Sequence, residues 1–314
     1  MSARNQSPPL PRIVLGTRGS DLALAQARIT ECALRQKWAI EIQIEIVRTG
    51  GDEGQRQPKV SNLARKTGRK GIFTAELERA LFEKRIDVAV HSAKDIPSQM
   101  DGALIIAGVL PRSSVEDLLL RKDGASTPMR TIATGSVRRQ RQTRATNPEA
   151  RIVPLRGNVP TRLRRFIESD WDAIILARAG LERLGFSPPE FEFDGHRIFV
   201  QILSTEKFLP AGGQGIIALQ TREADFPARQ IVSSIDDRDT HVCLRAEREF
   251  LRLLQGDCDL PVGVHAQVVN GELELRAQVF GDGAVPKIAM GRGRNPEKLA
   301  RNVFEKLERE HDHD

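Results

Sequence analysis

A lysine and an aspartate stand side by side directly after an apolar run, in the stretch RIDVAVHSAKDIP at residues 85–97. The alternating apolar residues predict a buried strand that stops at His91 and leads into a turn holding Lys94 and Asp95. Loops at the carboxyl ends of such strands are where α/β folds bind ligands. An ammonium beside a carboxylate suits a site where one group moves protons and the other holds an anion. A solvated pair on a surface turn is the alternative.

Arginines are concentrated in the middle of the chain, where residues 130–183 hold twelve arginines and no lysine. Two of them, Arg138 and Arg139, follow one predicted strand, and Arg156 follows the next, so they are expected at the ligand-binding edge of a sheet. The planar guanidinium group binds carboxylates at two points. A nucleic-acid surface would usually add lysines and stacking aromatics. The pattern therefore favours a ligand that carries carboxylates.

The three cysteines have no regular spacing and an odd count, which argues against a disulfide framework and against a zinc cluster. No metal site is expected. Cys32 and Cys243 fall in predicted helices and are expected to be small buried hydrophobes. Cys258 lies instead in a polar loop, QGDCDLP, bounded by glycine and proline.

Length and charge narrow the class of protein. The chain has 314 residues and a net charge of +6, which suits two or three domains and an anionic small molecule as partner. It opens with MSARNQSPPLPR, which has no apolar signal core, and no apolar run is long enough to span a membrane. We expect a soluble cytoplasmic protein.

Alternating strands and helices predict a mostly parallel sheet in the first third of the chain. Ser20 is the expected N-cap of the first helix, where Arg18 and free backbone amides could hold an anion. The segment 49–71 shows no periodicity and is expected to be a lid or a disordered loop. The predicted strands here are 12–16, 41–47, 86–91 and 104–110, and the predicted helices are 20–37 and 72–85.

The middle third repeats the alternation. Its predicted strands are 117–120, 131–134, 151–155 and 172–176, and its predicted helices are 137–146, 160–168 and 179–185. A polar crossing follows, and then LPAGGQG at 209–215, whose glycines indicate backbone passing close to a ligand or another strand. The last third is predicted to be α+β, with a helix over 240–254, a hairpin turning at Asn270-Gly271 and a final helix capped by Asn295.

Nine segments covering nearly the whole chain resemble the porphobilinogen deaminase (hydroxymethylbilane synthase) family. They are TRGSDLALAQ (17–26), RTGGD (48–52), GRKGIFTAELERAL (68–81), DVAVHSAKDIPS (87–98), TGSVRRQ (134–140), LRGNVPTRL (155–163), DAIILARAGLERLG (172–185), LPAGGQG (209–215) and GDCDLPVG (256–263). The resemblance implies two α/β domains like the lobes of a type 2 periplasmic binding protein, and a C-terminal α+β domain with a small antiparallel sheet. The expected domains are 12–110 with a return segment 213–233, then 111–209, and then 238–314.

The resemblance also implies an activity and a site. Four porphobilinogen molecules are condensed head to tail, with release of ammonia, to give hydroxymethylbilane for haem biosynthesis, in a monomeric enzyme. Asp95 takes the place of the catalytic aspartate, and Cys258 that of the cysteine whose thioether holds a dipyrromethane cofactor. Phe73 is placed against a pyrrole ring. Carboxylate binding falls on Arg18, Ser20, Lys94, Ser136, Arg138, Arg139, Arg156, Arg162, Arg183 and Gln214.

Three residues depart from the family pattern. Gly135 stands in place of a serine that bonds the cofactor, Asp21 in place of a common proline, and Asp257 in place of the glycine before the cysteine. A carboxylate beside the thiol disfavours the reactive thiolate, so Asp257 is expected to slow cofactor assembly.

Two other functions fit parts of the pattern. A non-catalytic two-lobe binding protein for a polycarboxylate explains the arginines, because fold does not fix function, but leaves Asp95 and Cys258 unused. A nucleic-acid binder using the arginine-rich segment would show steep salt dependence. The mild net charge and the scarcity of aromatics place it last.

Overall fold

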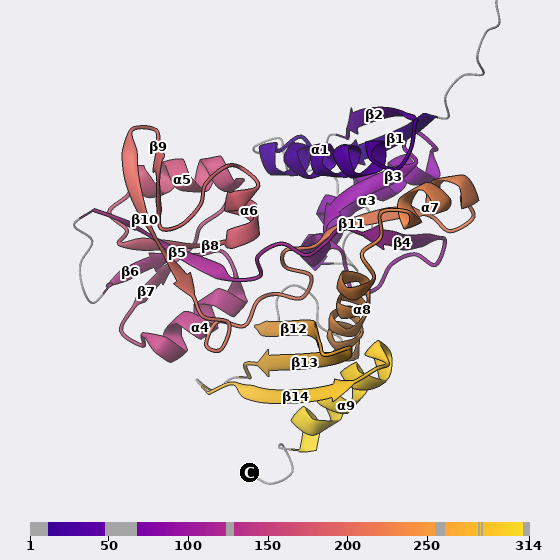
Figure 1. The fold of residues 1–314 in the computed structure, drawn as a ribbon. Coiled ribbons are helices and arrows are strands. Elements are labelled where there is room, and N and C mark those ends of the chain that lie inside the picture. Colours follow the sequence, from indigo (N-terminus) through magenta and orange to yellow (C-terminus); the bar gives the residue numbers. More distant parts are fainter. Residues whose placement is uncertain are drawn as a thin grey trace, which may run out of the picture.

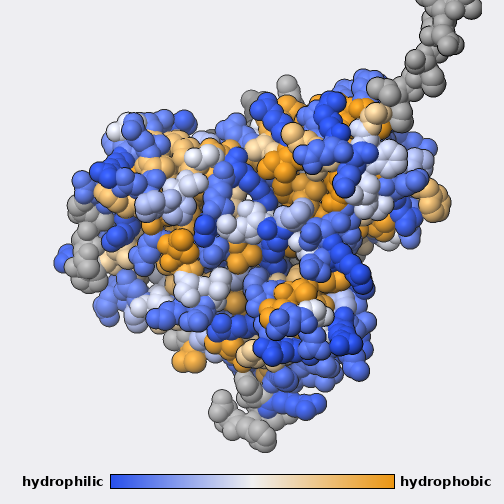
Figure 2. Space-filling view, in the orientation of Figure 1, coloured by the Kyte–Doolittle hydropathy of each residue, from blue (hydrophilic) through white to orange (hydrophobic). Residues whose placement is uncertain are grey.

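The computed structural model describes residues 12–47, 68–123, 129–254, 261–281, 283 and 285–309, with the side chains of 68–73 left aside. Three sheets occupy three separate parts of the molecule (Figure 1). We call them sheets A, B and C in chain order. Hydrophilic side chains cover most of the face in Figure 2, with smaller hydrophobic patches between them.

Sheet A has the strand order β2-β1-β3-β11-β4. The strands are β1 (Arg12–Thr17), β2 (Glu41–Ile46), β3 (Val88–Ser92), β4 (Leu104–Val109) and β11 (Ile217–Arg222). Its helices are α1 (Asp21–Arg35), α3 (Gly68–Phe82) and α7 (Phe226–Ser233). β11 pairs antiparallel with both β3 and β4, so four strands run in one direction and β11 runs against them. The prediction of a mostly parallel sheet is right for the strands that helices connect.

The core of sheet A explains why these segments form strands. Leu15 from β1, Val88 and Val90 from β3, and Leu219 from β11 are buried together against Leu34 of α1. Burying each such side chain stabilises the fold by about 1.5 to 3 kcal/mol. Ser20 caps α1 as predicted, accepting a hydrogen bond from the Ala23 amide at 3.3 Å.

Sheet B has the strand order β7-β6-β8-β5-β10-β9. The strands are β5 (Asp117–Lys122), β6 (Thr131–Ala133), β7 (Arg151–Val153), β8 (Ala173–Ala177), β9 (Glu190–Phe193) and β10 (His196–Leu203). Its helices are α4 (Val137–Thr146), α5 (Val159–Glu168) and α6 (Arg178–Glu182). Leu118, Leu120 and Phe166 centre its core. Each of the predicted segments appears close to its predicted bounds.

The hairpin β9–β10 was not predicted, and reading residues 186–208 as a polar crossing is wrong. The turn between its strands is Asp194-Gly195, with φ of 47° and 76°. This dipeptide is typical of a two-residue hairpin turn. Alternation in FEF and RIFVQIL was the signal that the sequence offered.

Sheet C has the order β12-β13-β14, with strands β12 (Val262–Val269), β13 (Glu272–Val279) and β14 (Lys287–Gly293). Helices α8 (Arg238–Leu253) and α9 (Pro296–Arg309) pack on it (Figure 1). The predicted turn at Asn270-Gly271 is confirmed, with φ of 51° and 77°. β14 was not predicted. The predicted fold class, two α/β parts and a C-terminal α+β part with a small antiparallel sheet, is confirmed.

The cysteines separate into three cases. Cys243 is buried as predicted, and burial raises the pKa of its thiol to about 12. Cys32 is exposed, so its predicted burial is wrong, because α1 buries the face formed by Ala23, Ala27 and Leu34 instead. Cys258 lies outside the described residues, as do Asp257 and most of the segment 49–71.

The sheets support a proposal about domain boundaries. We propose a first domain of 12–110 with the return segment 213–233, a second of 111–209 and a third of 238–314. The position of β11 inside sheet A is what supports the return segment. Within the described part of the chain, no helix is both long and apolar enough to cross a membrane.

Candidate active site

The strand β3 passes directly into a 3₁₀ turn, Ala93–Asp95, which holds Lys94 and Asp95. The strand ends one residue later than predicted, at Ser92. The backbone fixes the turn, because the Ala93 amide donates to the Ile216 carbonyl at 3.0 Å. Asp95 therefore stands on a rigid strand end, as the sequence predicted.

The Asp95 carboxylate lies among basic groups. Its charge acts on His91, Lys94 and Arg162, yet with the described residues its side chain makes neither a hydrogen bond nor an ion pair within 4.0 Å. Burial lowers the pKa of His91 to about 4, despite its hydrogen bond to Gln220. His91 is therefore neutral at pH 7. Because no described residue bonds to the Asp95 carboxylate, its oxygens can accept hydrogen bonds from a ligand.

Lys94 connects this turn with sheet B. Burial lowers the pKa of its ammonium group to about 8, with Asp95 acting in the opposite direction. Arg138, Arg139 and Asp117 also act on the charge of Lys94. The two basic patterns that the sequence singled out therefore meet in one place, between sheets A and B.

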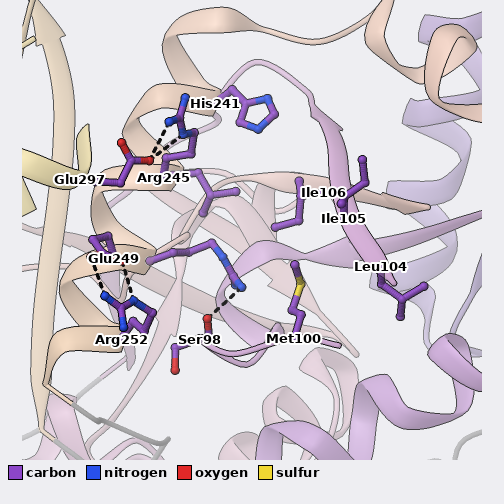
Figure 3. A pocket seen from close by; sticks show the side chains of 12 residues that line it. Ser98, Met100, Leu104, Ile105, Ile106, His241, Arg245, Glu249, Arg252 and Glu297 are labelled. Atoms are coloured by element: carbon purple, nitrogen blue, oxygen red, sulfur yellow. Dashed lines mark hydrogen bonds and ion pairs between the residues drawn. The ribbon is translucent and has the colours of Figure 1, made fainter. Parts of the chain in front are cut away.

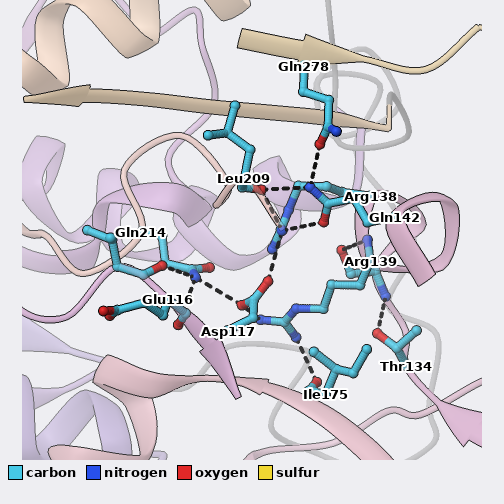
Figure 4. Close-up of polar contacts among 12 residues, drawn as sticks. Glu116, Asp117, Thr134, Arg138, Arg139, Gln142, Ile175, Leu209, Gln214 and Gln278 are labelled. Atoms are coloured by element: carbon cyan, nitrogen blue, oxygen red, sulfur yellow. Dashed lines mark hydrogen bonds and ion pairs between the residues drawn. The ribbon is translucent and has the colours of Figure 1, made fainter. Parts of the chain in front are cut away.

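Two of the four arginines of α4, Arg138 and Arg139, are buried, with 4% and 6% of their surfaces exposed. Figure 4 shows both directed toward Asp117. Arg138 Nη1 lies 2.8 Å from one carboxylate oxygen and Arg139 Nη2 lies 2.7 Å from the other. Arg138 Nη1 also donates to the Leu209 carbonyl at 2.8 Å, and Arg139 Nη1 to the Ile175 carbonyl at 2.9 Å. The arginines are thus held by the protein itself.

The segment 209–215 passes close to the turn that holds Lys94 and Asp95, as its glycines indicated. Gly213 has a φ of 76°, and a Cβ there would lie 2.8 Å from the Lys94 amide nitrogen. Gln214 is buried, and its Nε2 donates to the Val115 carbonyl at 2.7 Å and to Asp117 Oδ1 at 2.9 Å. Position 213 needs glycine, because the backbone has a positive φ there and passes close to the backbone of Lys94.

Two further predicted arginines adjoin this region. Burial lowers the pKa of Arg162 and of Arg183 to about 10. Arg162 Nε donates to the Gly157 carbonyl at 2.6 Å, and Arg183 Nη2 donates to the Gly215 carbonyl at 2.7 Å. Both remain cationic at pH 7 and can attract carboxylates.

The other predicted residues differ in their exposure and in the groups that they contact. The charge of Arg18 acts on buried His91, four residues before Asp95. Ser20 and Ser136 cap α1 and α4, so their hydroxyls already accept a backbone amide each. Arg156 is exposed. Nothing is described of the Phe73 side chain or of Cys258.

Gly135 also has a structural reason. A Cβ at this position would lie 2.4 Å from the Leu155 carbonyl oxygen. A serine here would require the ends of β6 and β7 to move apart.

The sequence analysis missed the acidic partners of the arginines. Asp117 begins β5, and Glu247 lies inside α8 within 2.6 Å of Arg112. Both carboxylates are fully buried. An acidic residue at the start of an apolar strand or on the buried face of a helix was the available signal, because a buried carboxylate requires a partner.

A separate hollow of about 350 Å³ lies between β4 and α8 (Figure 3). Two arginines at its rim pair with carboxylates, Arg245 with Glu297 and Arg252 with Glu249. The third, Arg248, donates to the Pro97 carbonyl at 2.8 Å. All three of these arginines are therefore engaged by other residues of the protein.

Comparison with known proteins shows which family the chain belongs to. A family model described as "Porphobilinogen deaminase, dipyromethane cofactor binding domain" matches residues 13–230, and "Porphobilinogen deaminase, C-terminal domain" matches residues 241–309. The chain belongs to the porphobilinogen deaminase family.

Named relatives show the same. The porphobilinogen deaminase of Syntrophobacter fumaroxidans is 40% identical over 272 residues, covering 85% of this chain and 84% of the relative. That of Nitrobacter winogradskyi is 39% identical over 273 residues, covering 85% and 82%. A distant likeness is the periplasmic VFT2 domain of Bordetella pertussis BvgS, with a TM-score of 0.41 and 13% identity over 72% of this chain and 86% of that one.

The described residues fit the dipyrromethane cofactor of the porphobilinogen deaminase family. The group carries carboxylates, and the Nε atoms of Arg138 and Arg139 are buried without a hydrogen-bond partner among the described residues. A buried donor without an acceptor is costly, and a carboxylate would relieve it. The residues that surround Asp95 are therefore suited to an anionic pyrrole ligand.

Proposed function

We propose that Asp95 is the catalytic carboxylate of the family's reaction in this protein. The protein is a hydroxymethylbilane synthase, a transferase that condenses four porphobilinogen molecules with release of ammonia. The observation that supports the assignment is the Asp95 carboxylate, fixed on a strand end, surrounded by basic groups and not engaged by the described residues.

The chemistry needs such a group. Loss of ammonia from an aminomethylpyrrole leaves a cationic, electron-poor substrate. A carboxylate held near the pyrrole nitrogen stabilises the developing positive charge and can accept and return a proton. Asp95 meets both requirements, because its turn is fixed by backbone hydrogen bonds and none of the described residues bonds to its oxygens.

Dipyrromethane, when joined to Cys258 by a thioether, supplies the pyrrole to which the first substrate molecule is added. We assign its carboxylates, and those of the substrate, to the basic and polar residues that the sequence indicated. The unpartnered Nε donors of Arg138 and Arg139 among the described residues support this, as does their electrostatic influence on Lys94. The assigned residues are Arg18, Ser20, Lys94, Ser136, Arg138, Arg139, Arg156, Arg162, Arg183 and Gln214, with Phe73 against a pyrrole ring.

We also propose that the protein works as a monomer in the cytoplasm, with a small-molecule substrate and without a nucleic-acid or membrane partner. The mild net charge of +6 supports the absence of a nucleic-acid or membrane partner. Light scattering on the purified protein checks the monomer, and a dimer mass at micromolar concentration would contradict it.

Intact-mass measurement tests the cofactor assignment. Cys258→Ser should give a folded protein without dipyrromethane and without activity, because a hydroxyl is far less nucleophilic than a thiol at neutral pH. Cys32→Ser is the matched control and should keep the cofactor, since Cys32 is exposed on α1. Normal dipyrromethane content in the Cys258 variant would remove the assignment.

Asp95→Asn tests the catalytic role. The amide keeps the size of the side chain and removes its charge, and loss of one such preorganised group lowers a rate by roughly 100- to 1000-fold. The cofactor-loaded variant should hardly elongate after one pulse of porphobilinogen, as read by mass spectrometry. Elongation at the wild-type rate would show that Asp95 is not the catalytic carboxylate.

A further inference from the structure

An acidic side chain sits inside the cluster of residues assigned to carboxylate binding. Asp117 has no exposed surface. Burial alone would raise the pKa of its carboxyl group, but the charges and hydrogen bonds of Arg138 and Arg139 hold that pKa well below its usual range. Asp117 is therefore ionised, in a place where a ligand's carboxylates would be repelled by it.

The contacts of Asp117 show what it does there. Its Oδ2 lies 2.8 Å from Arg138 Nη1, and its Oδ1 lies 2.7 Å from Arg139 Nη2 and accepts from Gln214 Nε2 at 2.9 Å (Figure 4). Arg138 and Arg139 come from α4, whereas Gln214 comes from the segment that packs on the catalytic turn. One carboxylate thus joins three residues that were each assigned to the ligand.

The hydrogen bonds also fix the guanidinium planes. A guanidinium group has five N–H donors. Asp117 accepts a hydrogen bond from Arg139 at 2.7 Å and forms an ion pair with Arg138 at 2.8 Å. The carbonyls of Leu209 and Ile175 take others at 2.8 and 2.9 Å. The Nε donors of both arginines remain without a partner among the residues that the structure describes. Each arginine is therefore held in one orientation with a donor still available.

The charges around Asp117 also indicate that the arginines are held in place before a ligand binds. Arg138, Arg139 and Lys94 bring three positive charges together, and the arginines act to lower the pKa of Lys94 while Asp117 acts to raise it. Asp117 and Asp95 bring two negative charges, which offset part of the positive charge and leave the cluster with a net positive charge for the ligand's carboxylates. Groups held in place beforehand bind more tightly, because less side-chain freedom is lost on binding.

We propose that Asp117 is a positioning residue for tetrapyrrole assembly, holding Arg138, Arg139 and Gln214 in the orientation that receives the carboxylates of the substrate and the growing chain. This inference rests on the function proposed above. It assigns to Asp117 no contact with the reacting atoms.

Asp117→Asn is the direct test, measured on the cofactor-loaded protein with porphobilinogen as substrate. The amide keeps the size but not the charge, and its NH₂ group opposes an arginine donor. Losing hydrogen bonds to charged groups corresponds to a rise in KM of about ten- to hundredfold. Partly elongated species should also accumulate after one pulse of substrate. A smaller folded fraction would lower the apparent kcat without changing KM, so KM separates positioning from stability.

Asp87→Asn is the matched control. Asp87 precedes β3, at the opposite end from Asp95, and its two oxygens also receive an arginine and a second donor, Arg222 and the Val14 amide. The KM of Asp87→Asn for porphobilinogen should equal that of the wild type. If Asp117→Asn does not fold, Asp117→Glu carries the test, since it keeps the charge but displaces the oxygens, and a raised KM is again expected.

Two results would overturn the inference. One is a wild-type KM with normal elongation in the Asp117 variant, and the other is an equal rise in KM for Asp87→Asn. Failure of the proposed function looks different, because the wild-type protein itself would then form no hydroxymethylbilane.

Discussion

At the scale of single residues, the site depends on how burial changes ordinary side chains. Lys94 combines a lowered pKa with a position beside Asp95. Asp95 and Lys94 are neighbours in sequence, and we propose different tasks for them. The Asp95 carboxylate makes no hydrogen bond or ion pair with the described residues, whereas the charge of Lys94 is influenced by Arg138 and Arg139. The spacing alone suggested this division, and the surrounding charges supply its physical basis.

The pKa of Lys94, about 8, predicts a pH dependence. Below pH 8 the ammonium group is charged and attracts substrate carboxylates. As the pH rises through 8 the free enzyme loses this charge, so kcat/KM for porphobilinogen should fall. Lys94→Arg should remove this decrease, because a guanidinium group stays charged over the whole range.

Lys122→Arg provides the control for this profile. Burial lowers the pKa of Lys122 as well, but its Nζ donates to carbonyls at the end of α5. This variant should keep the wild-type decrease. A decrease that persists unchanged in Lys94→Arg would assign it to another group.

At the scale of elements, the segment 209–215 and the turn that carries Asp95 support each other. The Ile216 carbonyl accepts from the Ala93 amide at 3.0 Å, and Gly213 lies against the backbone of Ala93 and Lys94. A loop and a strand end that are more than a hundred residues apart in sequence therefore form one unit.

Gly213→Ala should reduce kcat strongly. The added Cβ would lie 2.8 Å from the Lys94 amide nitrogen, and moving a catalytic group by about 1 Å can lower a rate by about 100-fold. The kcat of the cofactor-loaded variant is the measurement, and an unchanged kcat would contradict this account of the segment.

Gly271→Ala separates backbone strain from crowding. Gly271 has nearly the same φ, 77° against 76°, but nothing lies within 4 Å of the Cβ position. This variant should lose about 1 to 2 kcal/mol of stability from the left-handed conformation and keep the wild-type kcat.

At the scale of the whole molecule, one ion pair joins the part that holds sheet C to the link between sheets A and B. Arg112 lies on the link between sheets A and B, and Glu247 on α8 reaches it at 2.6 Å. Glu247 also accepts from the Gly213 amide at 2.6 Å and from the Ala266 amide of β12 at 2.7 Å. Sheet C is thereby fixed to the segment that supports the catalytic turn.

Glu247→Ala should lower the free energy of unfolding by about 3 to 5 kcal/mol, because it leaves Arg112 buried without its partner. Glu297→Ala removes an exposed pair with Arg245 and should change it by less than about 1 kcal/mol. Urea unfolding of both variants gives the comparison. Equal effects would mean that the buried pair does not hold the parts together.

Much of this arrangement could be predicted because it depends on short-range physics. Alternating and helical patterns of apolar residues located most strands and helices. Ser20 caps α1, and Asn270 and Gly271 form the hairpin turn, as their residue types predict. The position of Asp95 at the end of a buried strand followed from the same local rules. Resemblance over nine segments supplied the family.

Contacts between distant residues were decided only by the tertiary structure. Strand order placed β11 between β3 and β4, and the packing of α4 on sheet B brought Arg138 and Arg139 to Asp117. Helix rotation left Cys32 in solvent. Periodicity shows that a residue is on a buried or exposed face, but not which distant residue it meets. That depends on how sheets and helices pack, and a buried charge finds its partner only when they do.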